Sequence, residues 1–219
     1  YLNGIKAWLA DKAASMIVTE ASYEVSEPTI DSQIIKIKDS GADLFFSATT
    51  PKQAAQAIKK VYELGWHPVQ IVDINANSVG AVLKPAGLDA AKGVISTGYT
   101  KDPADPTWKD DAGMKKYLEF MAKYYPDGDK DSSFNSYGYS TSQLMVYVLE
   151  KCGDNLTREN VMKVATSLKN VQLDLALPGI LANTAPDDYR VNKQLQMMRF
   201  NGERWEMFGP ILEDAGPAG

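Results

Sequence analysis

Residues 43–66 place the strongest constraint on the fold, because a short apolar strand is followed there at once by a helix. Residues 44–46 form an apolar run, as expected of a strand that is buried on both faces. Thr50 and Pro51 form a typical helix start, with a capping side chain before a proline at the first helical position. Apolar residues then recur at helical spacing, at positions 54, 57, 58, 61 and 64. A strand that leads directly into a helix indicates an α/β fold with a parallel sheet.

The same alternation extends over the first hundred residues. Further strands are predicted over residues 16–23, 69–74 and 93–98, and helices over residues 1–9, 30–40 and 79–84. Strands that alternate with helices in this way pair in parallel through right-handed crossovers. The pattern predicts the α/β class for this part of the chain.

The pattern changes after Tyr99. Residues 101–106 are rich in proline and charge, which is typical of a linker or a domain crossing. Three helices are predicted next, over residues 113–125, 136–151 and 157–168. Near the end, Asn201-Gly202 separates two runs, 194–200 and 204–208, and predicts a β-hairpin. We expect residues 214–219 to be frayed.

Composition excludes several classes of function. A net charge of −5, with four scattered arginines, argues against a nucleic-acid partner. No apolar run approaches the roughly 20 residues of a membrane span. The single cysteine, Cys152, excludes an internal disulfide and a multi-cysteine zinc site. We expect it to be a small core residue near the end of a helix.

No set of catalytic residues is evident. His67, the single histidine, falls at a helix-to-strand turn without a nearby nucleophile, and we expect it to have a surface or packing role. Asp127, Asp129 and Asp131 resemble a calcium loop only in spacing, because the required glycine and terminal glutamate are missing. We therefore predict no enzyme activity, no catalytic residue, no metal and no cofactor.

Polar residues follow two successive strands, where ligands of open parallel sheets bind. Ser47, Thr49 and Thr50 follow the strand at 44–46, and a polar loop over residues 73–78 follows the next strand. Ordinary connecting loops are the alternative interpretation. A second candidate for a ligand site is an aromatic cluster at the start of the helix at 136–151, which comprises Phe134, Asn135, Tyr137 and Tyr139. The alternative interpretation is that these side chains are simply half-buried at a helix end. A ligand site without catalytic residues favours a binding protein.

Three segments resemble a known family: SEPTIDSQIIKIKDSGADLFFSATTPKQAAQAIKKVYELGW, GLDAAKGVISTGYTKDPADP and SYGYSTSQLMVYVLEKCG. In order and spacing they are similar to the branched-chain amino acid type (leucine/isoleucine/valine-binding-like) of periplasmic solute-binding protein. The resemblance covers nearly the whole chain. It implies a two-lobed type I periplasmic-binding-protein fold, with open, mostly parallel sheets flanked by helices and a ligand trapped by hinge closure.

The resemblance also implies a division into lobes. Residues 1–99 and 192–219 would form the second, C-terminal ligand-binding lobe, and residues 104–187 the C-terminal part of the first lobe. The crossings would lie near residues 100–103 and 188–191. We expect the N-terminal part of the first lobe to be absent, since an apolar helical stripe starts directly at Tyr1.

By the same resemblance, the ligand-binding residues of the second lobe are Ser47, Thr49, Thr50, Asn75, Ala76 and Asn77. Amino acid binders of the family usually carry an acidic side chain in the second of these loops, where this chain has Ala76. A neutral loop cannot supply a charge-assisted bond to the ligand ammonium. This favours a carboxylate without an ammonium, as in the aromatic-acid-binding subgroup.

The implied function is an exported, periplasmic receptor, made as a signal peptide precursor, that delivers a small-molecule carboxylate to the membrane permease of an ABC importer. It would not span the membrane or bind nucleic acid. Two alternatives stay open: an α/β enzyme whose catalytic residues lie in the missing segment, and a ligand-sensing regulator of the same fold.

Overall fold

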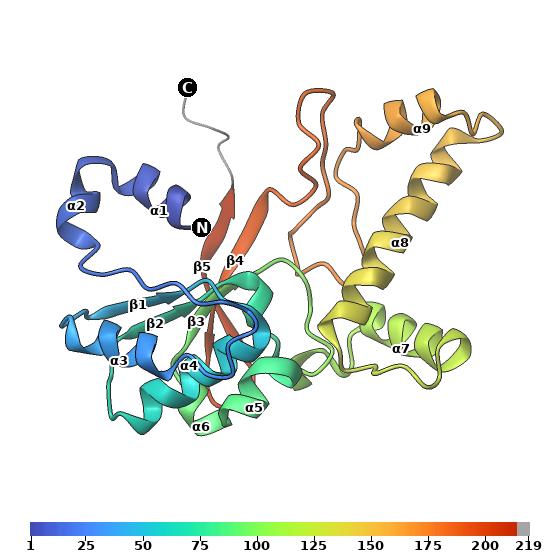
Figure 1. Cartoon of the computed structure of the whole chain (residues 1–219). Helices are drawn as coiled ribbons and strands as arrows, with labels where there is room; N and C mark the ends of the chain where they lie inside the picture. The colour runs from blue at the N-terminus through green and yellow to red at the C-terminus, as the bar shows by residue number, and fades with distance from the viewer. Residues whose placement is uncertain (214–219) are drawn as a thin grey trace. The chain divides into compact units, whose positions relative to one another are not determined.

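The computed structural model describes residues 1–213 and divides the chain into two compact units. One unit contains Tyr1–Ser96 and Phe200–Gly202, and the other contains Thr97–Arg199 and the chain from Glu203 onward. The strands are β1 (Leu44–Ser47), β2 (Val69–Val72), β3 (Ile95–Gly98), β4 (Gln194–Phe200) and β5 (Trp205–Glu213), and they form one sheet in this order (Figure 1). The lobe boundaries implied by the resemblance stay a prediction.

The first three strands are parallel. Leu44 lies opposite Val69 and Ser47 opposite Val72, while Ile71 of β2 lies opposite Ile95 of β3. The helical segments of this unit are α1 (Leu2–Leu9), η1 (Ala10–Lys12), α2 (Ala13–Met16), α3 (Asp31–Asp39), α4 (Pro51–Glu63), η2 (Ile74–Ala76), η3 (Val79–Leu83), α5 (Lys84–Ala86) and α6 (Leu88–Ala91). Strand, helix and parallel strand follow one another, so the predicted α/β class is confirmed.

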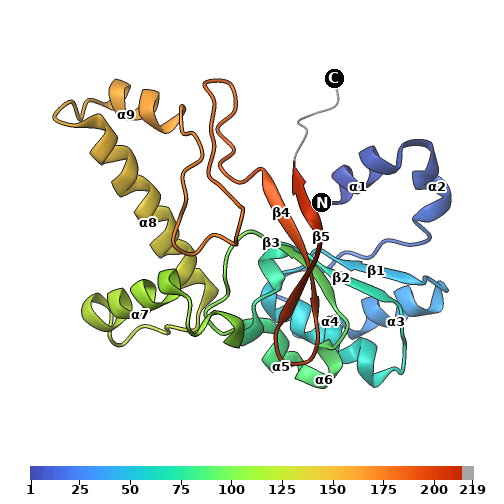
Figure 2. The same cartoon turned by 180° about the vertical axis from the view of Figure 1, so that it is seen from behind.

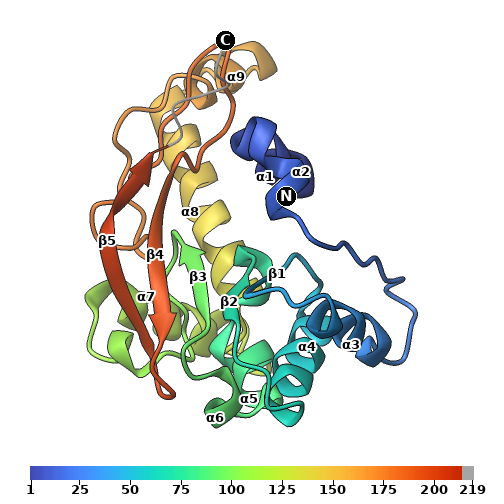
Figure 3. The same cartoon turned by 90° about the vertical axis from the view of Figure 1, so that its left-hand side faces the viewer.

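Apolar side chains of α3 and α4 pack against β1. Ile34 of α3, Phe45 of β1 and Val61 of α4 are buried in one cluster, with Trp66 packed at its edge. Figure 3 shows both helices on the same side of β1 and β2. This packing holds α4 in place, and with it the loop between β1 and α4.

The predicted strand over residues 16–23 is wrong. Met16 ends α2, and residues 17–24 form no regular secondary structure. Side chains of α3 bind this backbone: Lys36 Nζ donates to the Glu20 carbonyl at 3.0 Å and Gln33 Nε2 to the Ser22 carbonyl at 3.4 Å. Apolar alternation predicts an extended segment, but only pairing with another strand makes it part of a sheet.

The second unit is mainly helical, with η4 (Pro106–Trp108), α7 (Ala112–Tyr124), α8 (Ser133–Cys152) and α9 (Arg158–Ala165). Tyr117 of α7 is fully buried, and its ring lies 5.4 Å from that of Tyr139 on α8. Figure 2 shows α7 beside the first half of α8. Val148 and Cys152 fill a separate cluster with Leu168. The prediction that Cys152 is a core residue at a helix end is confirmed.

The predicted hairpin is also confirmed. Residues 201–204 join β4 to β5, and Gly202 takes a φ of 106°, which glycine adopts readily. Residues 214–219, which we expect to be frayed, lie outside the described part of the chain. Within residues 1–213, no helix combines the length and apolar character needed to cross a membrane.

Candidate ligand-binding site

The two predicted polar loops begin next to each other. Because β1 and β2 are parallel neighbours, their carboxyl ends lie at the same edge of the sheet. The backbone N–H of Asp73 donates to the carbonyl of Ser47 at 3.0 Å, so the two loops leave the sheet from one point. The fold thus brings together two groups of residues that are separated by some 25 positions in the sequence.

The loop after β1 is a network of hydroxyl groups. Ser47 is buried, and its Oγ lies 3.0 Å from Thr49 Oγ1. Thr50 occupies the N-cap position of α4, but its hydroxyl donates to Gln53 Oε1 and accepts no helix N–H. The backbone N–H of Thr50 donates to the Tyr23 hydroxyl at 2.8 Å. Tyr23 and Gln53 therefore fix the start of α4 and the loop before it.

The loop after β2 is organised by Asp73. This carboxylate accepts hydrogen bonds at Oδ2 from the backbone N–H of Asn75 at 3.2 Å and from Asn75 Nδ2 at 3.0 Å. Its other oxygen, Oδ1, is buried and has no hydrogen-bond partner within residues 1–213. Position 76 of this loop is an alanine and carries no charge, but the first residue of the loop, Asp73, is a buried acidic residue.

The other two predicted residues of this loop differ in exposure. Ala76 is fully buried, so its methyl group is part of the core, and its backbone N–H donates to the Asp73 carbonyl at 3.0 Å. Asn77 is half-buried, and its Nδ2 donates to Ser96 Oγ at 3.3 Å. Ser96, fully buried in β3, donates in turn to the Val72 carbonyl at 3.0 Å. Ser96 thereby holds the Asn77 amide against the end of the sheet.

Tyr1 is a further residue of this site that sequence reasoning missed. Its hydroxyl accepts a hydrogen bond from Asn75 Nδ2 at 3.0 Å, and its ring centroid lies 6.1 Å from that of Phe46 in β1. The sequence shows Tyr1 only as the first residue of an apolar helical stripe. Its position beside Asn75 depends on the path of residues 10–43, so no local sequence pattern predicts it.

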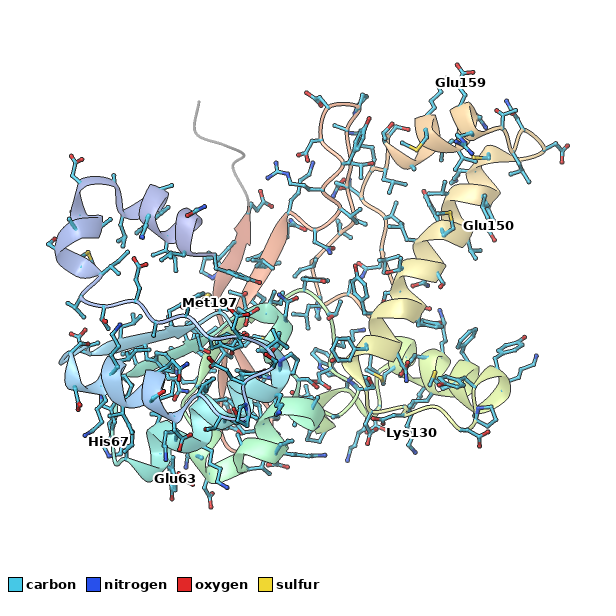
Figure 4. All side chains as sticks on the ribbon, in the orientation of Figure 1. Glu63, His67, Lys130, Glu150, Glu159 and Met197 are labelled. Atoms are coloured by element: carbon cyan, nitrogen blue, oxygen red, sulfur yellow. The ribbon has the colours of Figure 1, made fainter. Side chains whose placement is uncertain are left out.

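The remaining candidates lie elsewhere. His67 is exposed at the turn between α4 and β2, which places it at the amino end of β2 and so at the sheet edge opposite the site (Figure 4). Asp129 Oδ1 accepts from the Asp131 backbone N–H at 3.0 Å in a local turn. No group of three or more potential metal-ligating side chains occurs in the described residues.

The aromatic cluster at the start of α8 is divided by the fold. Phe134 and Tyr137 are exposed, whereas Tyr139 packs between Tyr117 and Phe120. The Tyr139 hydroxyl donates to Asp174 Oδ2 at 3.4 Å. Burial raises the pKa of this phenol, and the nearby carboxylate raises it further. Tyr139 thus stabilises the contact of α8 with α7 and is not placed as a ligand-binding wall.

Comparison with known proteins identifies the family. The sequence model of the periplasmic binding protein family matches residues 1–204. The chain therefore belongs to the periplasmic binding protein family, and the resemblance seen in the sequence is confirmed. A comparison with curated protein sequences finds no match.

Several solved structures have the same fold. A branched-chain amino acid ABC transporter from Thermus thermophilus with bound valine is 16% identical, with a TM-score of 0.74 over 88% of this chain and 52% of that one. A substrate-binding periplasmic protein from Ralstonia solanacearum is 19% identical, with a TM-score of 0.74 over 97% of this chain and 56% of that one. A fatty acid ABC transporter substrate-binding protein from Thermomonospora curvata is 20% identical, with a TM-score of 0.69 over 98% of this chain and 62% of that one. The chain thus spans less than two thirds of the length of each of these proteins.

Proposed function

We propose that the protein is an extracytoplasmic solute-binding receptor that captures a small carboxylate, either an aromatic acid or an amino acid-like compound, and delivers it to an ABC permease. The observation that carries the proposal is the pair of polar loops that leave the sheet at one point, where the Asp73 N–H meets the Ser47 carbonyl. Family membership supports a binding role, and neighbours of the same fold are substrate-binding proteins of ABC transporters.

Binding at this site needs no catalytic step. Its side chains are hydroxyls, amides and one carboxylate, which bind a ligand by hydrogen bonds once water is displaced. We propose that the ligand contacts are Ser47, Thr49, Thr50, Asn75 and Asn77, with Ala76 contributing only backbone. Closure of the first lobe over the bound ligand would be the signal that the permease recognises.

Thermal unfolding of the complete protein tests this proposal. Amino acids, aromatic acids and fatty acids are added singly, and each mixture is analysed afterwards for loss of the added compound. A true ligand at a hundred times its dissociation constant stabilises the folded state by about 2.7 kcal/mol. Stabilisation without chemical change is expected. Conversion of the stabilising compound would instead establish an enzyme.

A substitution ties the effect to the strand-end site. Thr49→Val removes the hydroxyl near Ser47 and keeps the side-chain shape, and we expect it to weaken binding by about tenfold, the loss of one good hydrogen bond. Thr141→Val is the matched control, because that hydroxyl donates only within its own helix, to the Tyr137 carbonyl. Equal affinities of the two variants would place the ligand elsewhere.

A further inference from the structure

The first turn of α4 has the sequence of a capping box, in which an N-cap threonine and a glutamine three positions later each bond to the other's backbone N–H. Thr50 and Gln53 occupy these two positions, but the box does not form. The Thr50 side chain accepts no backbone N–H of α4, and the backbone N–H of Thr50 donates to the Tyr23 hydroxyl at 2.8 Å. Two residues that usually stabilise a helix end therefore make other contacts.

The Gln53 side chain connects α4 to the segment before α3. Its Nε2 donates to the Val25 carbonyl at 3.1 Å, and its Oε1 accepts the proton of the Thr50 hydroxyl. Gln53 is only 1% exposed, and a buried amide costs free energy unless it is hydrogen-bonded. An apolar side chain would fill this position at less cost, so the packing of α4 does not by itself explain a glutamine here.

These contacts fix the direction of the Thr50 hydroxyl. A carbonyl only accepts hydrogen bonds, so the amide group that faces Val25 must be Nε2, and the group that faces Thr50 must be the oxygen. The Thr50 proton is therefore directed at Gln53. Thr50 is half-buried, so without this acceptor its hydroxyl would turn between several partners, water included. A group that is held in place before binding loses less conformational freedom when a ligand arrives.

We infer that Gln53 is a positioning residue of the ligand site, which holds the hydroxyl of Thr50 in one orientation before the ligand binds. Gln53 acts through Thr50 and does not itself contact the ligand. Both halves of its amide are needed, because the oxygen accepts from Thr50 and the NH₂ group holds the segment at Val25. The inference rests on the proposed function, in which Thr50 is a ligand contact, and adds a residue that the loop sequence does not contain.

A double-mutant cycle on the complete protein tests the inference by calorimetric titration. The probe is whichever of leucine, phenylalanine, 3-phenylpropionate and decanoate stabilises the protein most in thermal unfolding. Gln53→Met keeps the length of the side chain and removes both hydrogen bonds, and we expect it to weaken binding by about tenfold, the contribution of one good hydrogen bond. Thr50→Val should weaken binding to a similar degree. The double variant should bind no more weakly than Thr50→Val alone, because Gln53 then has no hydroxyl to position.

Two further measurements separate positioning from a general loss of stability. Gln143→Met is the matched control: it removes a comparable bond from a helix to a loop, since Gln143 Oε1 accepts from the Asp174 backbone N–H at 2.9 Å, and it should leave the affinity unchanged. In the protein without ligand, Gln53→Met should make hydrogen exchange of the Thr50 amide about tenfold faster and leave that of Val61, in the middle of α4, as it is. Gln53→Leu replaces Gln53→Met if the methionine variant does not fold.

The results that would overturn the inference are distinguishable. Additive losses of affinity in the double variant, or an unchanged affinity in Gln53→Met, contradict the positioning role but keep the receptor function. Unchanged exchange at Thr50 contradicts the role without reference to any ligand. If neither the four probes nor any other acid of the thermal screen binds, the proposed function fails and the inference falls with it.

Discussion

Gly113, near the start of α7, is a residue whose missing side chain is required by packing. A Cβ atom built there would lie 2.1 Å from the carbonyl oxygen of Asp174 and 2.8 Å from its carbonyl carbon. Both are backbone atoms, and the Asp174 carbonyl also accepts a hydrogen bond from Lys101 Nζ at 2.9 Å. The segment around Asp174 therefore has little freedom to move away.

We expect Gly113→Ala to lower the free energy of unfolding by about 1–3 kcal/mol, the usual cost of overpacking, although alanine is the better helix former. Gly138→Ala is the matched control. Gly138 lies in α8, and no atom beyond its chain neighbours and the backbone of its own helix lies within 4 Å of its Cβ position, so this substitution should stabilise by up to about 1 kcal/mol. Urea unfolding of both variants measures the effect, and stabilisation by Gly113→Ala would contradict the close approach.

Lys101 and Asp111 form a largely buried ion pair, with Lys101 Nζ 2.8 Å from Asp111 Oδ1. Burial acts to raise the pKa of the Asp111 carboxyl, but hydrogen bonds from Lys101 and from the Met114 backbone N–H outweigh it and hold the pKa below its usual 3.8. A lowered pKa in the folded state means that the ionised carboxyl stabilises the fold above pH 3.8. This contribution is lost as the pH falls through the folded-state pKa.

Asp111→Asn isolates this contribution, because asparagine keeps the cap on the Met114 N–H and removes the charge. We expect the variant to be less stable by about 1–3 kcal/mol at pH 7, the range for a hydrogen bond to a charged group, and the difference to shrink progressively below pH 3.8. Asp110→Asn, an exposed carboxylate 3.8 Å from Lys115, should change stability by less than about 0.5 kcal/mol. A difference that is independent of pH would show that the pair does not stabilise the fold electrostatically.

At the scale of single residues, the sequence predicts where a side chain lies when that residue directly follows a strand. Ser47 and Asn75 are at the carboxyl ends of adjacent strands, as the pattern indicates. The contacts of Tyr1 with Asn75, and of Ser96 with Asn77, could not be predicted, because each joins residues from different elements through a side-chain hydrogen bond. Such contacts depend on the relative positions of helices and strands, and no local sequence pattern predicts those positions.

At the scale of elements, Asp105 links the hairpin of β4 and β5 to the segment before α7. Its Oδ2 accepts from the Trp205 backbone N–H at 2.9 Å, and its Oδ1 accepts from the Thr107 N–H at 2.8 Å. Asp105 is buried, so both oxygens serve as acceptors away from water. The first residue of β5 is thus held by a side chain a hundred positions earlier in the sequence.

Asp105→Asn replaces one of these oxygens with an NH₂ group. This donor then faces the backbone N–H of Trp205 or Thr107, which is also a donor. We expect the free energy of unfolding to fall by about 1–3 kcal/mol, the cost of leaving a buried polar group unpaired. Hydrogen exchange of the Trp205 amide should become faster than in the unchanged protein. Asp127→Asn, in an exposed loop, is the control. Unchanged exchange at Trp205 would show that the hairpin is held by other contacts.

The elements themselves differ in how well they can be predicted. The α4 helix and the hairpin are marked by Thr50-Pro51 and Asn201-Gly202, whose backbone preferences are local, and both form where the sequence predicts them. The segment at residues 17–24 has the apolar alternation of a strand but bonds to side chains of α3. Strand formation is a property of two segments, so one segment alone does not predict it.

At the scale of the whole molecule, α8 carries both buried residues and large exposed apolar side chains. Ser136, Ser140, Val148 and Cys152 recur every fourth or eighth residue and are buried. Five large apolar side chains of the same helix are nevertheless exposed, and we call them the exposed apolar group of α8: Phe134, Tyr137, Met145, Val146 and Leu149. Exposed apolar area of this kind promotes association.

We expect the chain of residues 1–219 to bind the dye ANS and to self-associate with rising concentration, because the exposed apolar group of α8 lies at the surface. The double substitution Met145→Lys and Val146→Lys should reduce both effects, with helix content measured by circular dichroism as a check on folding. Glu150→Lys changes the net charge equally, from −5 to −3, without removing apolar area, and is the matched control (Figure 4). If Glu150→Lys reduces ANS binding and association as much as the double substitution, then net charge and not the exposed apolar group of α8 causes both effects.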